Sequence, residues 1–241
     1  MEHLEKIAEN YERVLEKISQ TARESGRDPA DVTLIVVTKG HSLEAVQAVL
    51  EAGAFRLGEN YVEEAVDKIL AISGKDRVEW HMIGHVQSRK ASPVCENFAW
   101  VHSLDSVKLA RRLDRFAGEL GRKLPALMEC NVSGEQSKYG WFAWNEADWS
   151  GLLHEFEQII NLSNLDVRGL MTMAPFLDDP MAARPYFKKL RLLQEYLAVH
   201  LPQAKWDQLS MGMSADYVAA IQEGATMLRI GTAIMGPRPD N

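Results

Sequence analysis

Short apolar runs alternate with amphipathic segments along the whole chain. The run TLIVVTK at 33–39 contains four consecutive apolar residues, most of them β-branched, as in a strand that is buried on both faces. Similar runs predict further strands at 55–60, 78–85, 100–105, 125–132, 167–174, 208–212 and 226–233. The segments between them place apolar residues at helical spacing and end near a glycine or a polar turn.

The segments with helical spacing predict one helix before the first strand and one after most strands. The first 18 residues combine apolar positions at helical spacing with charges between them. Further helices are expected at 42–53, 61–71, 88–97, 106–121, 145–160, 180–199 and 214–223. This alternation predicts an α/β protein with a parallel sheet, and eight such units fit a single (β/α)8 TIM barrel with an extra N-terminal helix. Because no shift in composition marks a boundary, we expect one domain over 1–241.

Composition narrows the classes of partner. The chain has 241 residues, 46% of them hydrophobic, and a formal net charge of −7. Nucleic acids and anionic membranes need a positive field, so neither is expected as a main partner. We expect no signal peptide and no membrane-spanning run. Cys95 and Cys130 are far apart without a CxxC motif, which favours a reducing cytoplasm and no metal site.

The loops after the last two strands contain the most specific polar pattern. In a barrel of this kind, functional residues lie at the carboxyl ends of the strands. Small residues there let backbone N–H groups approach an anion, and Ser214 is placed to begin a helix. The small residues of these two loops predict a phosphate site, and the alternative is that they are only turn glycines and helix caps. The positions are Ser210, Gly212, Ser214, Gly231 and Thr232.

Lys39 and Arg229 indicate which class of phosphorylated compound the site binds. Lys39 ends the first apolar run, and a lysine across the barrel mouth from a phosphate site suggests a Schiff base with a phosphorylated carbonyl compound. Both a lysine aldolase and a protein that holds pyridoxal 5′-phosphate fit this pattern. Arg229 lies among apolar neighbours, so it needs a carboxylate, a backbone carbonyl or a ligand as its partner.

Two histidines are weaker candidates. His81 and His85 are four residues apart, but on a strand this spacing lacks the geometry of a helical zinc motif. His81 remains a candidate for contact with a cofactor, with ordinary core packing as the alternative. The stretch NVSGEQSKYGW at 131–141 is expected to form a loop over the barrel mouth.

Eight motifs, taken in order, carry a resemblance to a known family. They are VVTKGHSLEAV, FRLGENYVEEAVDKI, WHMIGHVQSRKA, VHSLDS, NVSGEQSKYG, RGLMTMAP, LSMGMSADYVAAI and LRIGTAIMG. Together they resemble the YggS/PROSC family of pyridoxal phosphate-binding homeostasis proteins over nearly the whole chain. The resemblance implies a barrel similar to the N-terminal domain of alanine racemase, with Lys39 holding pyridoxal 5′-phosphate as a Schiff base.

The resemblance also implies roles for other residues. Ser210, Gly231 and Thr232 would bind the phosphate together with the Met213–Ser214 backbone. Arg229 would approach the pyridine nitrogen, and Asn60 would line the ring. A guanidinium about 4 Å from that nitrogen disfavours the pyridinium form by roughly 4 kcal/mol at an effective dielectric constant near 20, so the ring is a poor electron sink.

These points favour a carrier over an enzyme. A racemase of this barrel type needs a second acid or base, and the nearest candidates by position are Glu59, Tyr61, His85 and Asp105. The leading hypothesis is a cytoplasmic, monomeric protein without catalytic residues that holds pyridoxal phosphate and supplies it to apo-enzymes. A racemase of low activity and a cofactor-free aldolase are the alternatives.

Overall fold

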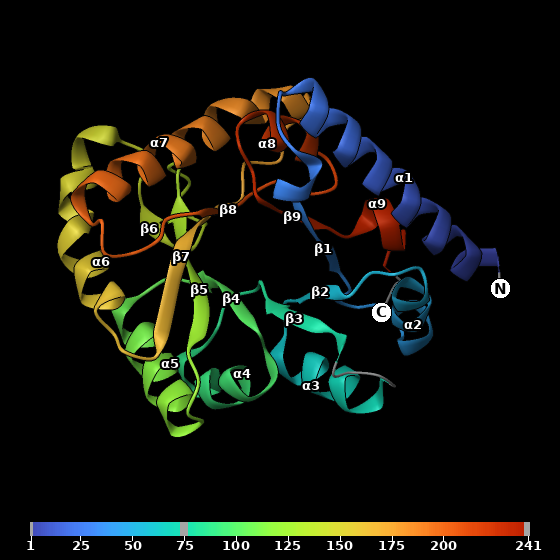
Figure 1. Cartoon of the computed structure of the whole chain (residues 1–241), viewed down its shortest axis with the longest axis horizontal. Coiled ribbons are helices and arrows are strands. Elements are labelled where there is room, and N and C mark those ends of the chain that lie inside the picture. Colours follow the sequence, from blue (N-terminus) through green and yellow to red (C-terminus); the bar gives the residue numbers. More distant parts are fainter. Residues whose placement is uncertain (1, 73–76, 239–241) are drawn as a thin grey trace.

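Parallel strands close into a barrel at the centre of the molecule (Figure 1). The computed structural model describes residues 2–72 and 77–238, so residues 1, 73–76 and 239–241 of the predicted domain lie outside the described part. Strand β9 pairs with β1 and β4 pairs with β5, which closes the ring of neighbours. The predicted (β/α)8 barrel is confirmed. Its strands are β1 (Thr33–Val37), β2 (Arg56–Glu59), β3 (Glu79–Met82), β4 (Trp100–Leu104), β5 (Leu124–Asn131), β7 (Leu165–Met171), β8 (Gln208–Ser210) and β9 (Met227–Ile230).

Helices surround the barrel, and polar side chains cap several of them. Ser42 Oγ accepts from Ala45 N, and Ser106 Oγ accepts from Leu109 N, so each satisfies a free N–H group at a helix start. The helices are α1 (Glu2–Glu24), α2 (Leu43–Glu51), α3 (Val62–Ala71), α4 (Ala91–Asn97), α5 (Val107–Glu119), α6 (Leu153–Ile160), α7 (Arg184–His200), α8 (Tyr217–Gln222) and α9 (Thr232–Met235). Short 3-10 turns at Ser88–Lys90, Glu146–Leu152 and Pro180–Ala183 precede α4, α6 and α7.

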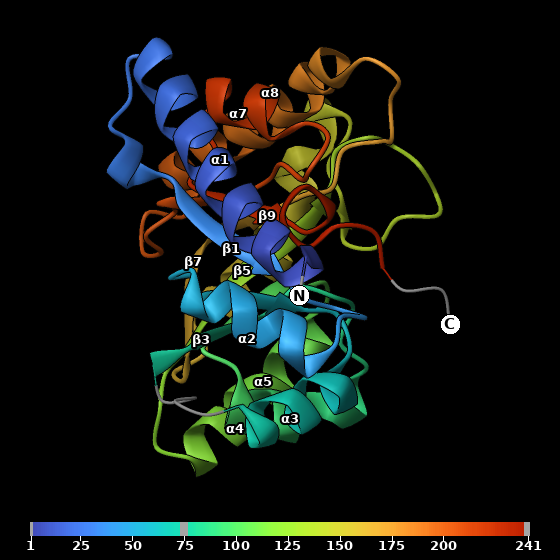
Figure 2. The same cartoon turned by 90° about the vertical axis from the view of Figure 1, so that its right-hand side faces the viewer.

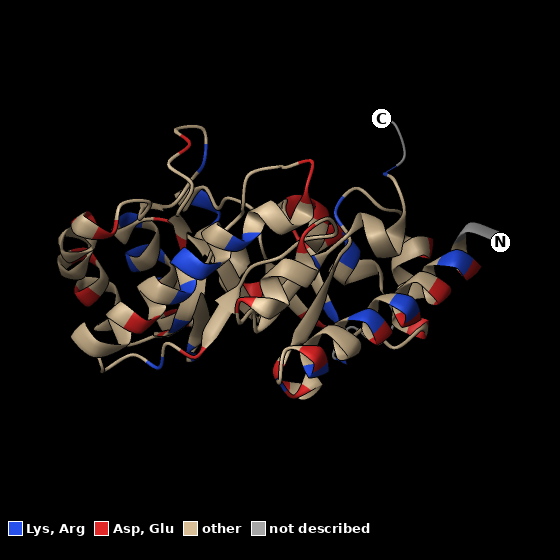
Figure 3. Ribbon diagram, turned by 90° about the horizontal axis from the view of Figure 1, so that it is seen from above, with Lys and Arg blue, Asp and Glu red and all other residues tan. Residues whose placement is uncertain are grey.

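The predicted N-terminal helix is present as α1 and packs along the outside of the barrel. It contacts α2, α8 and α9, and Figure 2 shows α1 and α2 on the same side of the molecule. Its apolar stripe, which includes Ile7, Val14 and Ile18, is buried. Blue and red segments alternate along α1 in Figure 3, so both signs of charge are mixed on this helix.

Two features differ from the predicted elements. Strands β1, β3, β7, β8 and β9 end two or three residues earlier than expected, because the last residues of each predicted run enter the loops at the barrel mouth. A short strand, β6 (Trp141–Phe142), begins at the last residue of the segment expected to be a loop and pairs with the end of β5. Trp141 anchors it, since its indole donates to Glu155 Oε2 at 2.8 Å and meets Phe156 edge to face.

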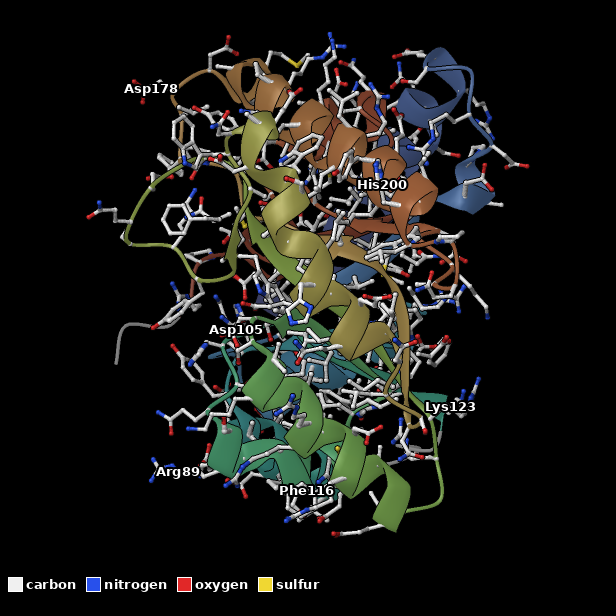
Figure 4. All side chains as sticks on the ribbon, turned by 90° about the vertical axis from the view of Figure 1, so that its left-hand side faces the viewer. Arg89, Asp105, Phe116, Lys123, Asp178 and His200 are labelled. Atoms are coloured by element: carbon white, nitrogen blue, oxygen red, sulfur yellow. The ribbon has the colours of Figure 1, made fainter. Side chains whose placement is uncertain are left out.

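The two ends of the barrel are distinct. In Figure 4, Asp105 and Asp178, which follow β4 and β7, lie on one side, whereas Lys123, which precedes β5, lies on the other. The lumen contains a small apolar cluster of Ile35, Leu127, Met171 and Met227. Most other buried side chains form a larger core around it. The carboxyl ends of the strands therefore share one face, where the candidate residues lie.

No helix in residues 2–72 and 77–238 combines the length and the apolar character needed to span a bilayer.

Candidate functional site

Lys39 lies at the mouth of the barrel, two residues beyond β1. It is half-buried, and no residue in the described part of the chain gives its Nζ a hydrogen bond or an ion pair. Burial lowers the pKa of this amine, as does the charge of Arg238, while Glu59 and Glu64 oppose the shift. A lowered pKa increases the neutral fraction, which is the nucleophilic form.

A buried cluster of charges holds the backbone on both sides of Lys39. Lys68 Nζ donates to Thr38 O at 2.6 Å, to Glu59 Oε1 at 2.8 Å and to Glu64 Oε1 at 2.6 Å. Thr38 Oγ1 also donates to Glu59 Oε1, and Gly40 N donates to Glu64 Oε1. These contacts tie the loop after β1 to β2 and α3, so the position of the Lys39 backbone is fixed by a network that sequence analysis missed.

Glu59 is committed to this cluster. Its carboxylate is fully buried, and burial raises its pKa while Lys68 and Thr38 oppose the rise. One oxygen, Oε2, has no hydrogen-bond partner among the described residues. Glu59 was a candidate for a second base. Its other oxygen, Oε1, already accepts a hydrogen bond from the buried ammonium of Lys68.

Arg229 lies inside the barrel on β9. Its Nη1 donates to Ser210 Oγ at 2.5 Å and its Nη2 to Thr172 O at 2.8 Å. The partners are thus a hydroxyl and a backbone carbonyl, and a carbonyl was one of the expected alternatives. Burial lowers the pKa of Arg229 to about 10, opposed by Glu129 and Asp216, so the guanidinium stays charged at neutral pH.

Ser210 and His81 lie below the mouth, in the lumen. The Ser210 hydroxyl contacts Arg229 and also lies 2.8 Å from His102 Nδ1. His102 Nε2 lies 2.9 Å from His81 Nδ1, and both histidines are fully buried. His81 and His85 are not brought together, because His85 lies at the mouth beside Asp105.

The loops after β8 and β9 meet at Ser214. Its Oγ accepts from the backbone N–H groups of Gly231 and Ala233, both at 3.2 Å. Gly231 leaves little room, since a Cβ there would lie 3.3 Å from Val37 Cβ. Thr232 begins α9 and is exposed, and Met213 N donates to Asp216 Oδ1 at 2.6 Å. Two N–H groups therefore converge on one oxygen at the predicted phosphate position.

Gly212 has a packing role in addition to its predicted place in the phosphate site, which stays a prediction. Its φ is +94°, and an added Cβ would lie 2.6 Å from Ala220 Cβ. This contact is with α8, so Gly212 allows the helix to pack closely.

Asn60 follows β2 and lines a cavity of about 590 Å³ at the mouth. Glu129, on β5, lines the same cavity; burial, with a contribution from Asp105, raises its pKa to about 7. His85 Nδ1 lies 2.9 Å from Asp105 Oδ2, and its ring stacks on Tyr139 with centroids 4.3 Å apart. The cavity therefore combines an amide, a carboxyl group and an imidazole.

Three polar residues of the site, His102, Glu129 and Lys68, were not predicted from the sequence. His102 and His81 are both histidines within short apolar runs, which could have marked a polar pair in the lumen. Glu129 likewise interrupts the apolar run of β5. Lys68 gave no comparable signal, because it lies on a helix with other charged residues.

Comparison with known proteins identifies relatives over almost the whole chain. Residues 3–239 match the family model of the alanine racemase N-terminal domain. The pyridoxal phosphate homeostasis protein of Vibrio alginolyticus is 41% identical over 236 residues, which cover 96% of this chain and 97% of that protein. The protein of the same name from Pseudomonas aeruginosa is 42% identical over 237 residues and covers 96% of each chain.

A solved structure agrees in fold. PipY of Synechococcus elongatus PCC7942, with PLP bound, matches with a TM-score of 0.81 at 35% identity. The match covers 95% of this chain and 100% of that one.

Proposed function

This chain belongs to the pyridoxal phosphate homeostasis proteins, within the alanine racemase N-terminal domain family, and we propose that it binds pyridoxal 5′-phosphate as a Schiff base on Lys39. The observation that carries the proposal is the Lys39 amine, which is half-buried at the barrel mouth and without a partner in the described part of the chain. When bound, the cofactor supplies an aldehyde carbon that reacts reversibly with an amine.

The phosphate end of the cofactor fits the loops after β8 and β9. Ser214 Oγ accepts from the N–H groups of Gly231 and Ala233, so its own proton remains to be donated to a phosphate oxygen. We assign Ser214, Gly231 and Thr232, with the Met213–Ser214 backbone, to the phosphate. Ser210 is assigned to Arg229 instead, because its hydroxyl already has two partners in the lumen.

The ring end of the cofactor fits Arg229 and Asn60. Arg229 is donor-only and stays charged, so it can donate to a neutral pyridine nitrogen but not accept its proton. Asn60 is half-buried at the cavity edge and is assigned to the face or edge of the ring.

Holding the cofactor, rather than transforming amino acids, is the activity that these residues support. Of the candidates for a second base, Glu59 is bonded to Lys68, and His85 is paired with Asp105. Tyr61 is 60% exposed, so it is not held inside a closed site. We infer that the chain acts as one domain and one monomer that passes its cofactor to apo-enzymes.

Borohydride reduction tests the attachment. The reduced protein should carry a pyridoxyl phosphate mass on the peptide that contains Lys39, and Lys39→Ala should lose both the adduct and the visible absorbance band. Lys90→Ala is the matched control, because Lys90 also lies at the mouth but is paired with Glu63. An adduct found solely on another lysine would contradict the assignment.

Transfer of the cofactor tests the role. The loaded protein, separated from free cofactor, should restore the activity of a pyridoxal phosphate-dependent apo-enzyme, and Lys39→Ala should not. Size-exclusion chromatography with light scattering should give the mass of one chain. If the loaded protein restores the activity of the apo-enzyme only when an equal amount of free cofactor is also added, the carrier role is wrong.

A further inference from the structure

A chain of polar contacts crosses the barrel lumen beneath Arg229. It runs from Arg229 on β9 to Ser210 on β8, then to His102 on β4 and His81 on β3. The exposed fraction of each of these side chains is 4% or less. His81 Nε2 lies 3.1 Å from Glu79 Oε1, and the Glu79 side chain is 40% exposed. The chain therefore links a buried cation near the mouth with a carboxylate that reaches solvent.

Arg229, at one end of this series of polar contacts, determines the direction of the hydrogen bonds in it. Arg229 can only donate, so the Ser210 oxygen accepts and its one proton is left for His102 Nδ1. His102 then carries its proton on Nε2 and donates to His81 Nδ1. His81 in turn carries its proton on Nε2, facing the carboxylate of Glu79. With both histidines neutral and the proton on Nε2, every donor from Arg229 Nη1 to His102 Nε2 has an acceptor, and His81 Nε2 lies 3.1 Å from Glu79 Oε1 without hydrogen-bonding geometry.

The surroundings favour these neutral forms. Burial lowers the pKa of His81 and lowers that of His102 well below its ordinary value, and the charge of Arg229 adds to the effect on His102. The indole of Trp100 stacks on His81 with ring planes 10° apart, and meets His102 edge to face. Aromatic packing thus restrains the rings in the orientation that the hydrogen bonds need.

The series of polar contacts fixes the guanidinium of Arg229. Two of its five donors are used, one by Ser210 on β8 and one by the carbonyl of Thr172, the residue that follows β7. Without an acceptor at His102, the Ser210 proton would have no partner in the lumen, and the hydroxyl would be free to rotate away from Arg229. An unpaired buried donor is costly, so His102 acts on Arg229 through Ser210.

We propose that His102 is a positioning residue, which fixes Arg229 through Ser210 so that the guanidinium meets the pyridine nitrogen of the cofactor. This inference rests on the proposed function. It requires three properties: a fixed tautomer at His102 and His81, a conformation of Arg229 that depends on His102, and an effect on the cofactor confined to its ring nitrogen.

The tautomers are tested without cofactor. Nitrogen-15 NMR of the cofactor-free protein at neutral pH should show both imidazoles neutral with the proton on Nε2. His81→Gln and His102→Gln assign the two sets of signals. A proton on Nδ1 of either ring, or a normal titration of His102, would overturn the hydrogen-bond chain.

The positioning role is tested by cofactor binding. His102→Phe should weaken binding of pyridoxal phosphate about tenfold and shift the absorbance maximum of the bound cofactor. His102→Gln keeps an acceptor and a donor, so it should stay within about threefold of the wild type.

An analogue with CH in place of the ring nitrogen separates positioning from packing. It cannot accept from Arg229, so wild type and His102→Phe should bind it equally. An equal loss with both ligands would mean that His102 only supports the barrel. If the wild type binds no cofactor, the proposed function and the positioning role both fail, whereas the NMR result still decides whether the chain exists.

Discussion

At the scale of single residues, the candidate site depends on three different physical properties. Lys39 offers an amine that burial makes less basic and that no described residue pairs. Gly231 lacks a side chain where Val37 leaves little space. Ser214 offers a hydroxyl that already gathers two backbone N–H groups. Each property can be changed separately.

Ser214→Ala and Gly231→Val should weaken cofactor binding to different extents. Ser214→Ala removes one hydrogen-bonding group, worth about 0.5 to 1.5 kcal/mol and more when the partner is charged. Gly231→Val adds bulk beside Val37 and displaces the N–H groups, so its effect should be larger. Titration with pyridoxal phosphate measures both. Binding of pyridoxal, which lacks the phosphate, should change little in Ser214→Ala, and an equal loss with both ligands would contradict the phosphate site.

Glu129 should make the cofactor-free protein less stable as the pH rises. Its pKa is raised from 4.5 to about 7, so between these values the folded protein holds a proton that the unfolded chain releases. Stability from this group is complete below pH 4.5 and is lost as the pH rises through 7, by on the order of 3 kcal/mol. Urea unfolding of wild type and Glu129→Gln should show the variant gaining relative stability between pH 4.5 and 8. A constant difference between them would show that Glu129 ionises normally.

At the scale of elements, the loop between β1 and α2 depends on α3. Lys68 of α3 reaches beneath the loop to Thr38 O and to Glu59 of β2. Parallel strands alone would leave the loop after Val37 free to move. The buried ammonium instead joins three successive elements, and Lys39 lies within the joined segment.

Lys68→Met should therefore destabilise the protein and disturb Lys39. Removing one partner of a buried pair leaves the Glu59 carboxylate unpaired, which costs about 3 to 5 kcal/mol. Urea unfolding measures this loss. The double variant Lys68→Met with Glu59→Gln should recover part of it, because no unpaired charge is then buried. Simple addition of the two single effects would argue against a coupled pair.

At the scale of the whole molecule, the barrel presents its strand ends on one face and keeps its polar lumen closed. Arg229 holds its charge beneath that face, and an arginine disfavours protonation of a pyridine nitrogen that it meets. The loaded protein should consequently exchange the α-proton of amino acids slowly or not at all.

Deuterium incorporation into alanine and other amino acids in heavy water measures this exchange, with Lys39→Ala as the control. Exchange that depends on Lys39 and proceeds at ordinary enzyme rates, on the order of 1 to 1000 per second, would show a racemase instead of a carrier.

The order and type of the elements followed from the sequence, because apolar periodicity reports directly which faces are buried. All eight barrel strands lie within or beside the predicted runs, and the N-terminal helix is present. The sequence also singled out Lys39, Ser214 and Gly231, since the end of a barrel strand is recognisable from where an apolar run stops. Short β6 was missed because two residues carry no periodicity.

Only the tertiary structure decided which polar groups meet. Ser210 was grouped with the phosphate loop by its neighbours in sequence, but its side chain points into the lumen, where β4 supplies His102 and β9 supplies Arg229. Lys68 joined Glu59 and Thr38 only when α3 packed against the barrel. Hydrogen bonds and buried ion pairs need distances near 3 Å between residues far apart in the chain, and a pattern along one sequence contains no such distances.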